Sequence, residues 1–233
     1  METAPFGSDR IDAIVFDVIG TLVDEDATWA RVSEKLATEA GLGEPGVLRA
    51  RWAGLLERRM AAVVAGESPW RSHRRLVVDC ADDALAGLGA SPSPATSMMA
   101  STVDREYVAW PDVADATAAL RRRRLVAAVS NGDLDALARL ANANAITWDV
   151  ALSTAAVRTF KPAPAAYRYA IDALDIDPTR TLFVASHPWD LRAAAGHGFR
   201  TAYVARPGAE APTDTDHFDL AVADLSELAE LLD

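Results

Sequence analysis

The chain has 233 residues, 50% of them hydrophobic, and a formal net charge of -11, which is enough apolar material for one full core and a smaller satellite domain. The negative charge opposes general attraction to nucleic acid or anionic lipid, and no apolar run approaches the roughly 18 residues that a membrane helix needs. Residues 1–10 lack the apolar segment of a secretion signal and Cys80 has no second cysteine to pair with, so we expect a cytoplasmic protein.

The first predicted element is a strand near residues 11–16, where Ile14, Val15 and Phe16 form a run typical of a buried strand. A long segment follows, from Trp29 to about Ala109, that is rich in helix-forming residues. Glycine- and proline-containing breaks at residues 41–46, 66–69 and 91–94 divide it into about four helices. Cys80 falls inside one of these helices, where we interpret it as core packing.

After residue 111 the pattern changes to short β-branched runs that alternate with alanine-rich helices. Strands are predicted at residues 125–129, 150–152, 181–184 and 201–204. Such alternation predicts an α/β fold with a Rossmann-like, doubly wound parallel sheet. Residues 1–24 and 111–233 then form the catalytic core, and residues 25–110 form an inserted helical cap that covers the site.

Two charged runs have ordinary surface interpretations. Arg121 to Arg124 is expected at the solvated last turn of a helix, where cations interact favourably with the helix dipole. The acidic residues 213–219 are expected in a surface loop. Neither run indicates a function.

Polar residues recur where the predicted strands end. Taken singly, each has an ordinary structural explanation as a helix cap, a turn residue or a surface lysine. Because the carboxyl ends of parallel strands meet at one edge of a sheet, we expect the groups to share one pocket. These groups are Asp17 with Thr21, Ser130 with Asn131, Lys161 with Tyr167, and Ser186, His187, Trp189 and Asp190.

This ordered set resembles the haloacid dehalogenase superfamily and, within it, the hydrolytic 2-haloacid dehalogenases. The resemblance covers nearly the whole chain and is strongest in the core half. It is carried by FDVIGTL at residues 16–22, VSNG at 129–132, FKP at 160–162 with Tyr167, and VASHPWD at 184–190. It implies an aspartate nucleophile, a helical cap and a possible homodimer through the cap helices.

The expected roles of the charged residues follow from their chemistry. An ionised Asp17 can attack a carbon that bears a leaving group and form an ester, which water then hydrolyses. Lys161 beside it would lower its pKa and balance the charge that develops. Asp190 is suited to polarise the water as general base, an assignment that the resemblance supports.

The remaining candidates are expected to bind the substrate. Thr21, Ser130 and Asn131 offer hydrogen-bond donors, and Tyr167 would brace Lys161 and the substrate carboxylate. His187 has three possible roles, as a substrate ligand, a base or a surface histidine. The other expected contacts are Ser186 and Trp189, with Ile19 as an apolar wall or, as we favour, core.

Two departures from the phosphatase pattern of the superfamily argue against a metal. The phosphatases carry a second aspartate two residues after the nucleophile, where this chain has Ile19. Ser186 stands where their last motif has its first acidic residue, and a hard cation such as Mg²⁺ prefers oxygen ligands of that kind. We therefore expect no metal and no other cofactor.

The chain also departs from the dehalogenase pattern in the cap. The family usually has an arginine directly after a tryptophan, whereas Trp52 is followed here by Ala53. A shift of one position on a helix turns a side chain by about 100°, so no arginine can be carried over directly. Nearby candidates are Arg49, Arg51, Arg58 and Arg59. The other histidines, His73, His197 and His217, are expected to be structural or solvated.

The sequence thus predicts a hydrolase that displaces halide from a small 2-substituted carboxylic acid, with (S)-2-haloacids as the first choice. Three alternatives remain open. These are a magnesium-dependent phosphatase, an enzyme that opens another carbon–heteroatom bond, and a binding protein that keeps the fold without activity.

Overall fold

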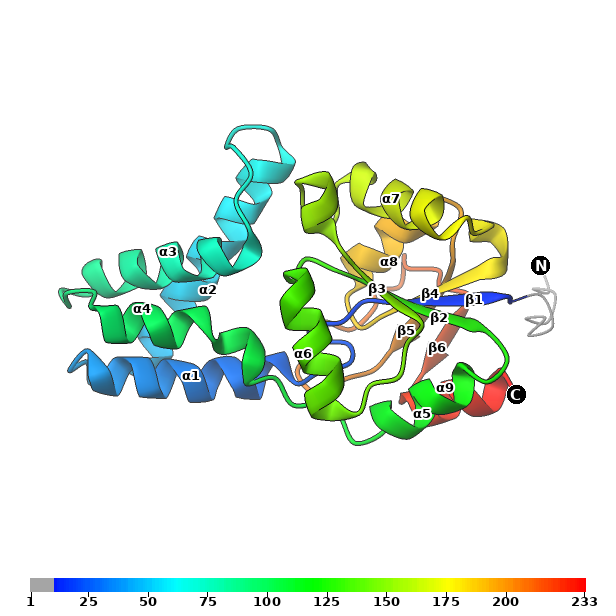
Figure 1. Cartoon of the computed structure of the whole chain (residues 1–233), viewed down its shortest axis with the longest axis horizontal. Helices are drawn as coiled ribbons and strands as arrows, with labels where there is room; N and C mark the ends of the chain where they lie inside the picture. The colour runs from blue at the N-terminus through cyan, green and yellow to red at the C-terminus, as the bar shows by residue number, and fades with distance from the viewer. Residues whose placement is uncertain (1–10) are drawn as a thin grey trace.

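The protein is described by a computed structural model that covers residues 11–233. Residues 1–10, in which the sequence predicts no secretion signal, lie outside the described residues. The described part contains a six-stranded sheet in the order β3-β2-β1-β4-β5-β6, and every pair of neighbours is parallel. Helices cover this sheet, and a group of further helices stands beside it (Figure 1). The predicted α/β fold is confirmed.

The strands follow the predicted positions closely, with one exception. β6 was not predicted. It lies at the edge of the sheet and has only three residues, too few to show the alternation of apolar and polar side chains that marks a strand. The strands are β1 Ala13–Phe16, β2 Leu125–Ser130, β3 Val150–Ser153, β4 Thr181–Ala185, β5 Arg200–Val204 and β6 Leu220–Val222.

β1 occupies the middle of the sheet, which explains its continuous apolar sequence. All four of its residues are buried, as expected for a strand covered on both faces. It pairs with β2 on one side and β4 on the other. The backbone N–H of Asp17 continues this pairing by donating to the Val184 carbonyl at 2.9 Å. The residue that follows β1 is therefore held firmly at the carboxyl edge.

Helices pack on both faces of the sheet, so it is doubly wound. One apolar cluster joins Val15 and Phe183 to α7 (Pro164–Leu174) and α8 (Pro188–Ala195). The opposite cluster joins Ile14 and Val184 to α5 (Val113–Leu120), α6 (Leu134–Asn144) and α9 (Leu225–Leu231).

Between β1 and β2 the chain forms the cap helices α1 to α4, which Figure 1 shows beside the sheet. The predicted break at residues 66–69 falls between helices, and those at 41–46 and 91–94 do so except for their last residues, since α2 begins at Pro45 and α4 at Pro94. Each of three helices begins with a side-chain cap, namely Asp24, Ser72 or Ser93. The bounds are α1 Glu25–Glu39, α2 Pro45–Val64, α3 His73–Ala86 and α4 Pro94–Ser101, with short 3₁₀ helices at Val103–Arg105, Thr154–Val157 and Pro178–Arg180.

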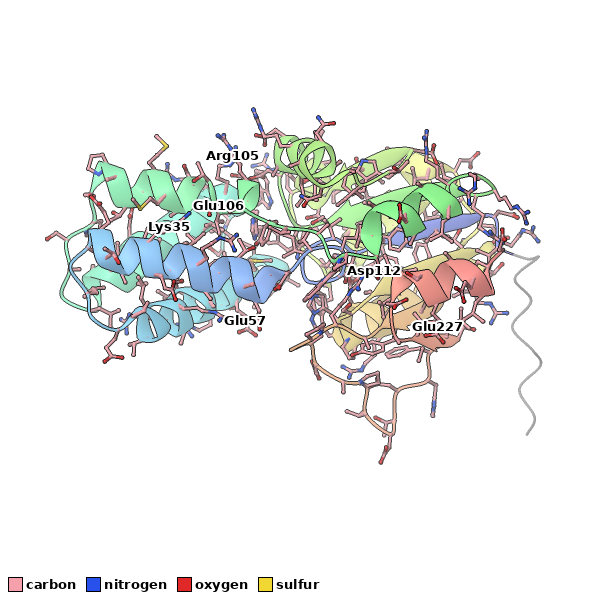
Figure 2. The ribbon with its side chains drawn as sticks, turned by 90° about the horizontal axis from the view of Figure 1, so that it is seen from below. Lys35, Glu57, Arg105, Glu106, Asp112 and Glu227 are labelled. Carbon is pink, nitrogen blue, oxygen red and sulfur yellow. The ribbon has the colours of Figure 1, made fainter. Side chains whose placement is uncertain are left out.

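The buried apolar side chains of the cap helices are continuous with the apolar cluster on one face of the sheet. The rings of Trp29 and Trp52 meet edge-on with centroids 4.5 Å apart, and Cys80 is fully buried, as predicted. Burial raises the pKa of the Cys80 thiol to about 11, which keeps it protonated. On the surface, Figure 2 shows Lys35 close to Glu106, and their charged groups lie 2.8 Å apart.

The cap joins the sheet through two neighbouring chain segments. The Asp24 N–H donates to the Val108 carbonyl at 2.8 Å, and the Trp110 N–H donates to the Leu22 carbonyl at 3.1 Å. A second junction lies at the start of α3, where the Arg74 guanidinium contacts Asp135 at 2.8 Å. The cap is thus attached at its ends and again across the edge of the sheet.

The charged runs lie on the surface. Arg121 directly follows α5 and pairs with Asp149, so the run begins just past the helix end and not within its last turn. Residues 213–219 form a loop, as predicted. Among the described residues, no helix combines the length and apolarity that crossing a bilayer requires.

Arg206, just after β5, ties together three parts of the core. It is buried, and its guanidinium contacts both oxygens of Asp112 at 2.9 and 2.8 Å. Its Nε donates to the Thr21 carbonyl at 2.9 Å, in the turn that follows Asp17. The Asp112 side chain is only 11% exposed, so removal of the guanidinium would leave a largely buried carboxylate without its cation.

We predict that Arg206→Met lowers the free energy of unfolding by about 3 kcal/mol, because breaking a buried ion pair strands its partner. Urea denaturation at pH 7 measures this loss. The matched control is Arg200→Met, whose exposed pair with Asp219 is expected to contribute less than about 1 kcal/mol. Equal losses in the two variants would contradict the structural role of Arg206.

Candidate active site

The site is built around Asp17, the first residue after β1. Its carboxylate is almost completely buried, yet it lines a cavity of about 770 Å³. The Thr21 hydroxyl donates to Asp17 Oδ2 at 2.8 Å and accepts from the Ser186 N–H at 2.9 Å. The carboxylate is therefore fixed in direction while one side of it faces the cavity.

The turn that holds Asp17 requires glycine at position 20. Gly20 has φ +85°, and a Cβ there would lie 2.6 Å from His187 Nε2. No side chain fits without moving the imidazole. The short turn from Asp17 to Thr21 thus brings the Asp17 carboxylate, the Thr21 hydroxyl that donates to it, and His187 together.

Lys161 lies between the two carboxylates at the centre of the site. Its ammonium contacts Asp17 Oδ1 at 2.6 Å and Asp190 Oδ2 at 2.5 Å, and all three side chains are buried. The backbone N–H of Lys161 donates to Asn131 Oδ1 at 2.7 Å, which fixes the loop after β3 against the end of β2. The three strand ends therefore converge as predicted.

Asp190 lies in the first turn of α8 and is fully buried behind Lys161. The Tyr167 hydroxyl, from α7, donates to its other oxygen, and the Tyr167 ring stacks on His197. His197 is thus structural, as predicted. Asp190 has two partners on two oxygens, so its orientation is fully determined.

The single ammonium affects the two carboxylates differently. Burial is the largest single influence and would raise the pKa of Asp17, but the charges of Lys161 and His187 and the hydrogen bonds from Lys161 and Thr21 together outweigh it and lower that pKa. Burial dominates at Asp190 and raises its pKa in spite of Lys161. Lys161 itself has a raised pKa because the attraction of both carboxylates exceeds the effect of burial. Asp17 is therefore the carboxylate that is kept ionised, and Asp190 is the more basic of the two.

His187 and Trp189 form the wall beside Asp17. His187 Nε2 lies 3.0 Å from the Ile19 carbonyl oxygen and 3.8 Å from Asp17 Oδ2. The two rings stack with centroids 5.7 Å apart. His187 is only partly exposed, so the surface-loop interpretation does not describe its position.

The cavity has a volume of about 770 Å³ and separates the predicted site residues into two groups. Six of them line it, namely Asp17, Ser130, Asn131, Lys161, His187 and Trp189. The other four, Thr21, Tyr167, Ser186 and Asp190, are buried behind this wall. In the structure these four contact or flank the charged residues and do not face the space that a substrate would occupy.

Several lining residues were missed by the sequence analysis. Glu25 opens α1, is half-buried, and has a raised pKa chiefly because its carboxyl group is shielded from solvent. His73 was expected to be structural or solvated, but it is buried and lines the cavity. Ile19, favoured as core, packs against the core but also lines the cavity. The acidic start of α1 was the only signal for Glu25, and it reads equally well as a helix cap.

The structure selects among the four candidate arginines of the cap. Arg49 lines the cavity one helical turn before Ala53 and therefore on the same face of α2. It pairs with Asp26 at 2.5 Å. Arg59 pairs instead with Asp83, and neither Arg51 nor Arg58 lines the cavity. Arg49 thus places a cation where the arginine after Trp52 is missing.

The donor set does not suit a magnesium ion of the phosphatase type. Asp17 and Asp190 already contact Lys161, and Ser186 offers only a hydroxyl in the last motif. Within residues 11–233, no group of three or more histidine, cysteine, aspartate or glutamate side chains is arranged to hold a metal ion.

Comparisons with known proteins agree with this geometry. The family described as haloacid dehalogenase-like hydrolase matches residues 11–198. (S)-2-haloacid dehalogenase 1 of Pseudomonas sp. (strain CBS-3) is 28% identical over 85% of this chain and 86% of its own length.

Solved structures extend the similarity. The L-2-haloacid dehalogenase PA0810 is 28% identical, with a TM-score of 0.85 over 95% of this chain and 98% of its own. The Xanthobacter autotrophicus L-2-haloacid dehalogenase with chloropropionic acid covalently bound is 26% identical. Its TM-score is 0.79, over 95% of this chain and 98% of its own.

We predict that Lys161→Met destabilises the protein far more at pH 8 than at pH 5. Without the ammonium, the folded-state pKa values of Asp17 and Asp190 rise above the unfolded values near 4, so the folded variant binds more protons than the unfolded chain. Its stability then falls as pH increases. The expected loss at pH 8 is about 3–5 kcal/mol, measured by urea denaturation.

The control for this experiment is Lys35→Met, which removes an exposed ammonium from its pair with Glu106. Its effect is expected to stay below about 1 kcal/mol at both pH values. If Lys161→Met lost the same stability at pH 5 and pH 8, the proposed charge balance would be wrong.

Proposed function

The chain belongs to the haloacid dehalogenase-like hydrolases, and on this premise we propose that it displaces halide from a 2-haloacid through an ester on Asp17. The observation that carries the proposal is the ionised Asp17 carboxylate, held by Lys161 and Thr21 and open to a cavity. The (S)-enantiomer is the first choice, because the relatives are named (S)- or L-2-haloacid dehalogenases.

In the first step, an Asp17 oxygen attacks the carbon that bears the halogen. The new C–O bond forms as the C–halogen bond breaks, and the halide leaves with the electron pair. Asp17 loses its negative charge in this step. Lys161 keeps it ionised beforehand, and Thr21 fixes the oxygen that is not attacking.

In the second step, water attacks the carbonyl carbon of the ester and releases the 2-hydroxy acid. Asp190 has the raised pKa that suits a base, while the adjacent Lys161 can stabilise the oxyanion that forms. We assign the water's proton to Asp190. Because Asp190 lies behind the cavity wall, this assignment requires the water to enter beside Lys161.

The substrate carboxylate is assigned to Arg49. This guanidinium lines the cavity, and its exposed pair with Asp26 can be exchanged for a ligand at small cost. Glu25 beside it has a raised pKa and, while protonated, can donate a hydrogen bond to the same carboxylate or to the halide.

The rival functions are disfavoured by specific observations. A magnesium-dependent phosphatase lacks support from the donor set described above. A binding protein without activity has no need to bury two carboxylates against one ammonium. Displacement of a different leaving group uses the same machinery and is separated only by the substrate tested.

Three features of the protein stay predictions from the sequence. These are the cytoplasmic location, the homodimer and the role of residues 25–110 as a cap over the site.

We predict that Asp17→Asn abolishes halide release from (S)-2-chloropropionate, because a neutral amide cannot form the ester. Single-turnover hydrolysis by the unmodified protein in ¹⁸O-water is expected to label the Asp17 carboxylate, detected by peptide mass spectrometry. Substantial turnover by the variant would overturn the nucleophile assignment.

The same assay separates the rival enzymes. Halide release should persist in EDTA. Phosphate release from a phosphoester panel that is lost on chelation, without any halide release, would instead identify a phosphatase.

We predict that Arg49→Met raises KM for (S)-2-chloropropionate about tenfold or more with a smaller effect on kcat, because it removes binding that is common to ground and transition states. The matched control is Arg58→Met, on the same helix and outside the cavity. Activity on the neutral amide of the substrate should be insensitive to either change. An equal rise in KM for acid and amide would place the carboxylate elsewhere.

A further inference from the structure

The cavity is much larger than a short haloacid needs. Its volume of about 770 Å³ falls in the range of sites that enclose drug-sized ligands. 2-Chloropropionate has roughly six non-hydrogen atoms and, at about 30 Å³ for each water-sized group, fills on the order of a quarter of such a space. Most of the cavity would remain around it.

The additional space follows one face of α2. Lining residues recur along this helix with the spacing of a single face, from Arg49 to Ala65. Ala53 and Ala65 are about 18 Å apart along the helix axis, at 1.5 Å per residue. The cavity therefore continues well beyond the part that faces Asp17.

This face of α2 is mostly apolar after Arg49. Leu56 is buried, Met60 and Val64 are half-buried, and the lining alanines Ala53, Ala61 and Ala65 are small and exposed. Apolar side chains on the exposed side of a helix gain stability only when something covers them. The small alanines leave room for that cover, and Glu57 is the exception to the apolar character.

His73 adds a polar group to the wall of this space. Its side chain is 9% exposed and lines the same cavity, but within the described residues its imidazole has no hydrogen-bond partner. Burial lowers the pKa of His73, so the ring is kept neutral. A molecule bound in the cavity can therefore offer the His73 imidazole a hydrogen-bond partner.

We infer that the site takes a 2-substituted carboxylic acid with an apolar chain of about six or more carbons beyond the reacting centre, which lies along α2. The inference rests on the proposed function. The carboxylate lies at Arg49, the reacting carbon faces Asp17, and the chain covers Met60, Ala61 and Val64. The reaction itself is unchanged, since the chain contributes binding free energy alone.

The test compares kcat/KM for (S)-2-bromopropionate and (S)-2-bromooctanoate. A buried methylene can contribute up to about fourfold, so five additional methylenes are expected to raise kcat/KM at least tenfold. An equal or lower value for bromooctanoate would overturn the inference.

A variant locates the chain. Ala61→Trp fills the proposed groove and is expected to lower the bromooctanoate-to-bromopropionate ratio of kcat/KM at least tenfold. The control is Ala50→Trp, an exposed position on α2 outside the cavity, which should keep the ratio. A ratio retained in Ala61→Trp, or lost equally in both variants, would refute binding along α2.

Failure of the proposed function gives a different result. If neither bromoacid releases bromide, the affinities for the unreactive acids octanoate and propionate are compared by calorimetry. Tighter binding of octanoate, sensitive to Ala61→Trp, would support the groove without the dehalogenase activity. Equal affinities would overturn the groove as well.

Discussion

The structure depends on one buried ammonium shared by two buried carboxylates. The Lys161 ammonium lies 2.6 Å from Asp17 and 2.5 Å from Asp190. With both carboxylates ionised, the three side chains together carry a net charge of about −1. Burial makes ionisation of both carboxylates costly, so the fold must hold the lysine in place with few alternatives. Asn131 does so through the lysine backbone, while Tyr167 and Thr21 fix the two acids from behind. The two carboxylates therefore differ in pKa, which is lowered at Asp17 and raised at Asp190.

The parallel sheet is what makes such an arrangement possible from distant parts of the sequence. Asp17 follows β1, Lys161 comes from the loop after β3, and Asp190 enters with the helix after β4. Because neighbouring strands run in the same direction, all three segments end at one edge. The cap then contributes what the core lacks, a cation at Arg49 and a long apolar wall.

Sequence reasoning predicted the core half of the site but only part of the cap half. Asp17, Lys161 and Asp190 each follow an apolar strand, so their meeting point is fixed by topology before any packing is known. Arg49 and His73 lie on helices whose orientation relative to the sheet depends on tertiary contacts. The hydrophobic pattern of a helix shows which face is buried, but not which residues face the carboxyl edge of the sheet. Likewise, the sequence identified Tyr167 as part of the site but could not show that it lies behind Asp190.

The cap enters and leaves the core at adjacent points, where the segment after Leu22 runs beside the segment before Trp110. A domain whose two ends lie close together can be inserted into a loop without distorting the fold that carries it. Such an inserted domain can be replaced as a unit in evolution, while the sheet that carries the reaction stays intact. Recognition and reactivity can therefore diversify at separate rates along one polypeptide.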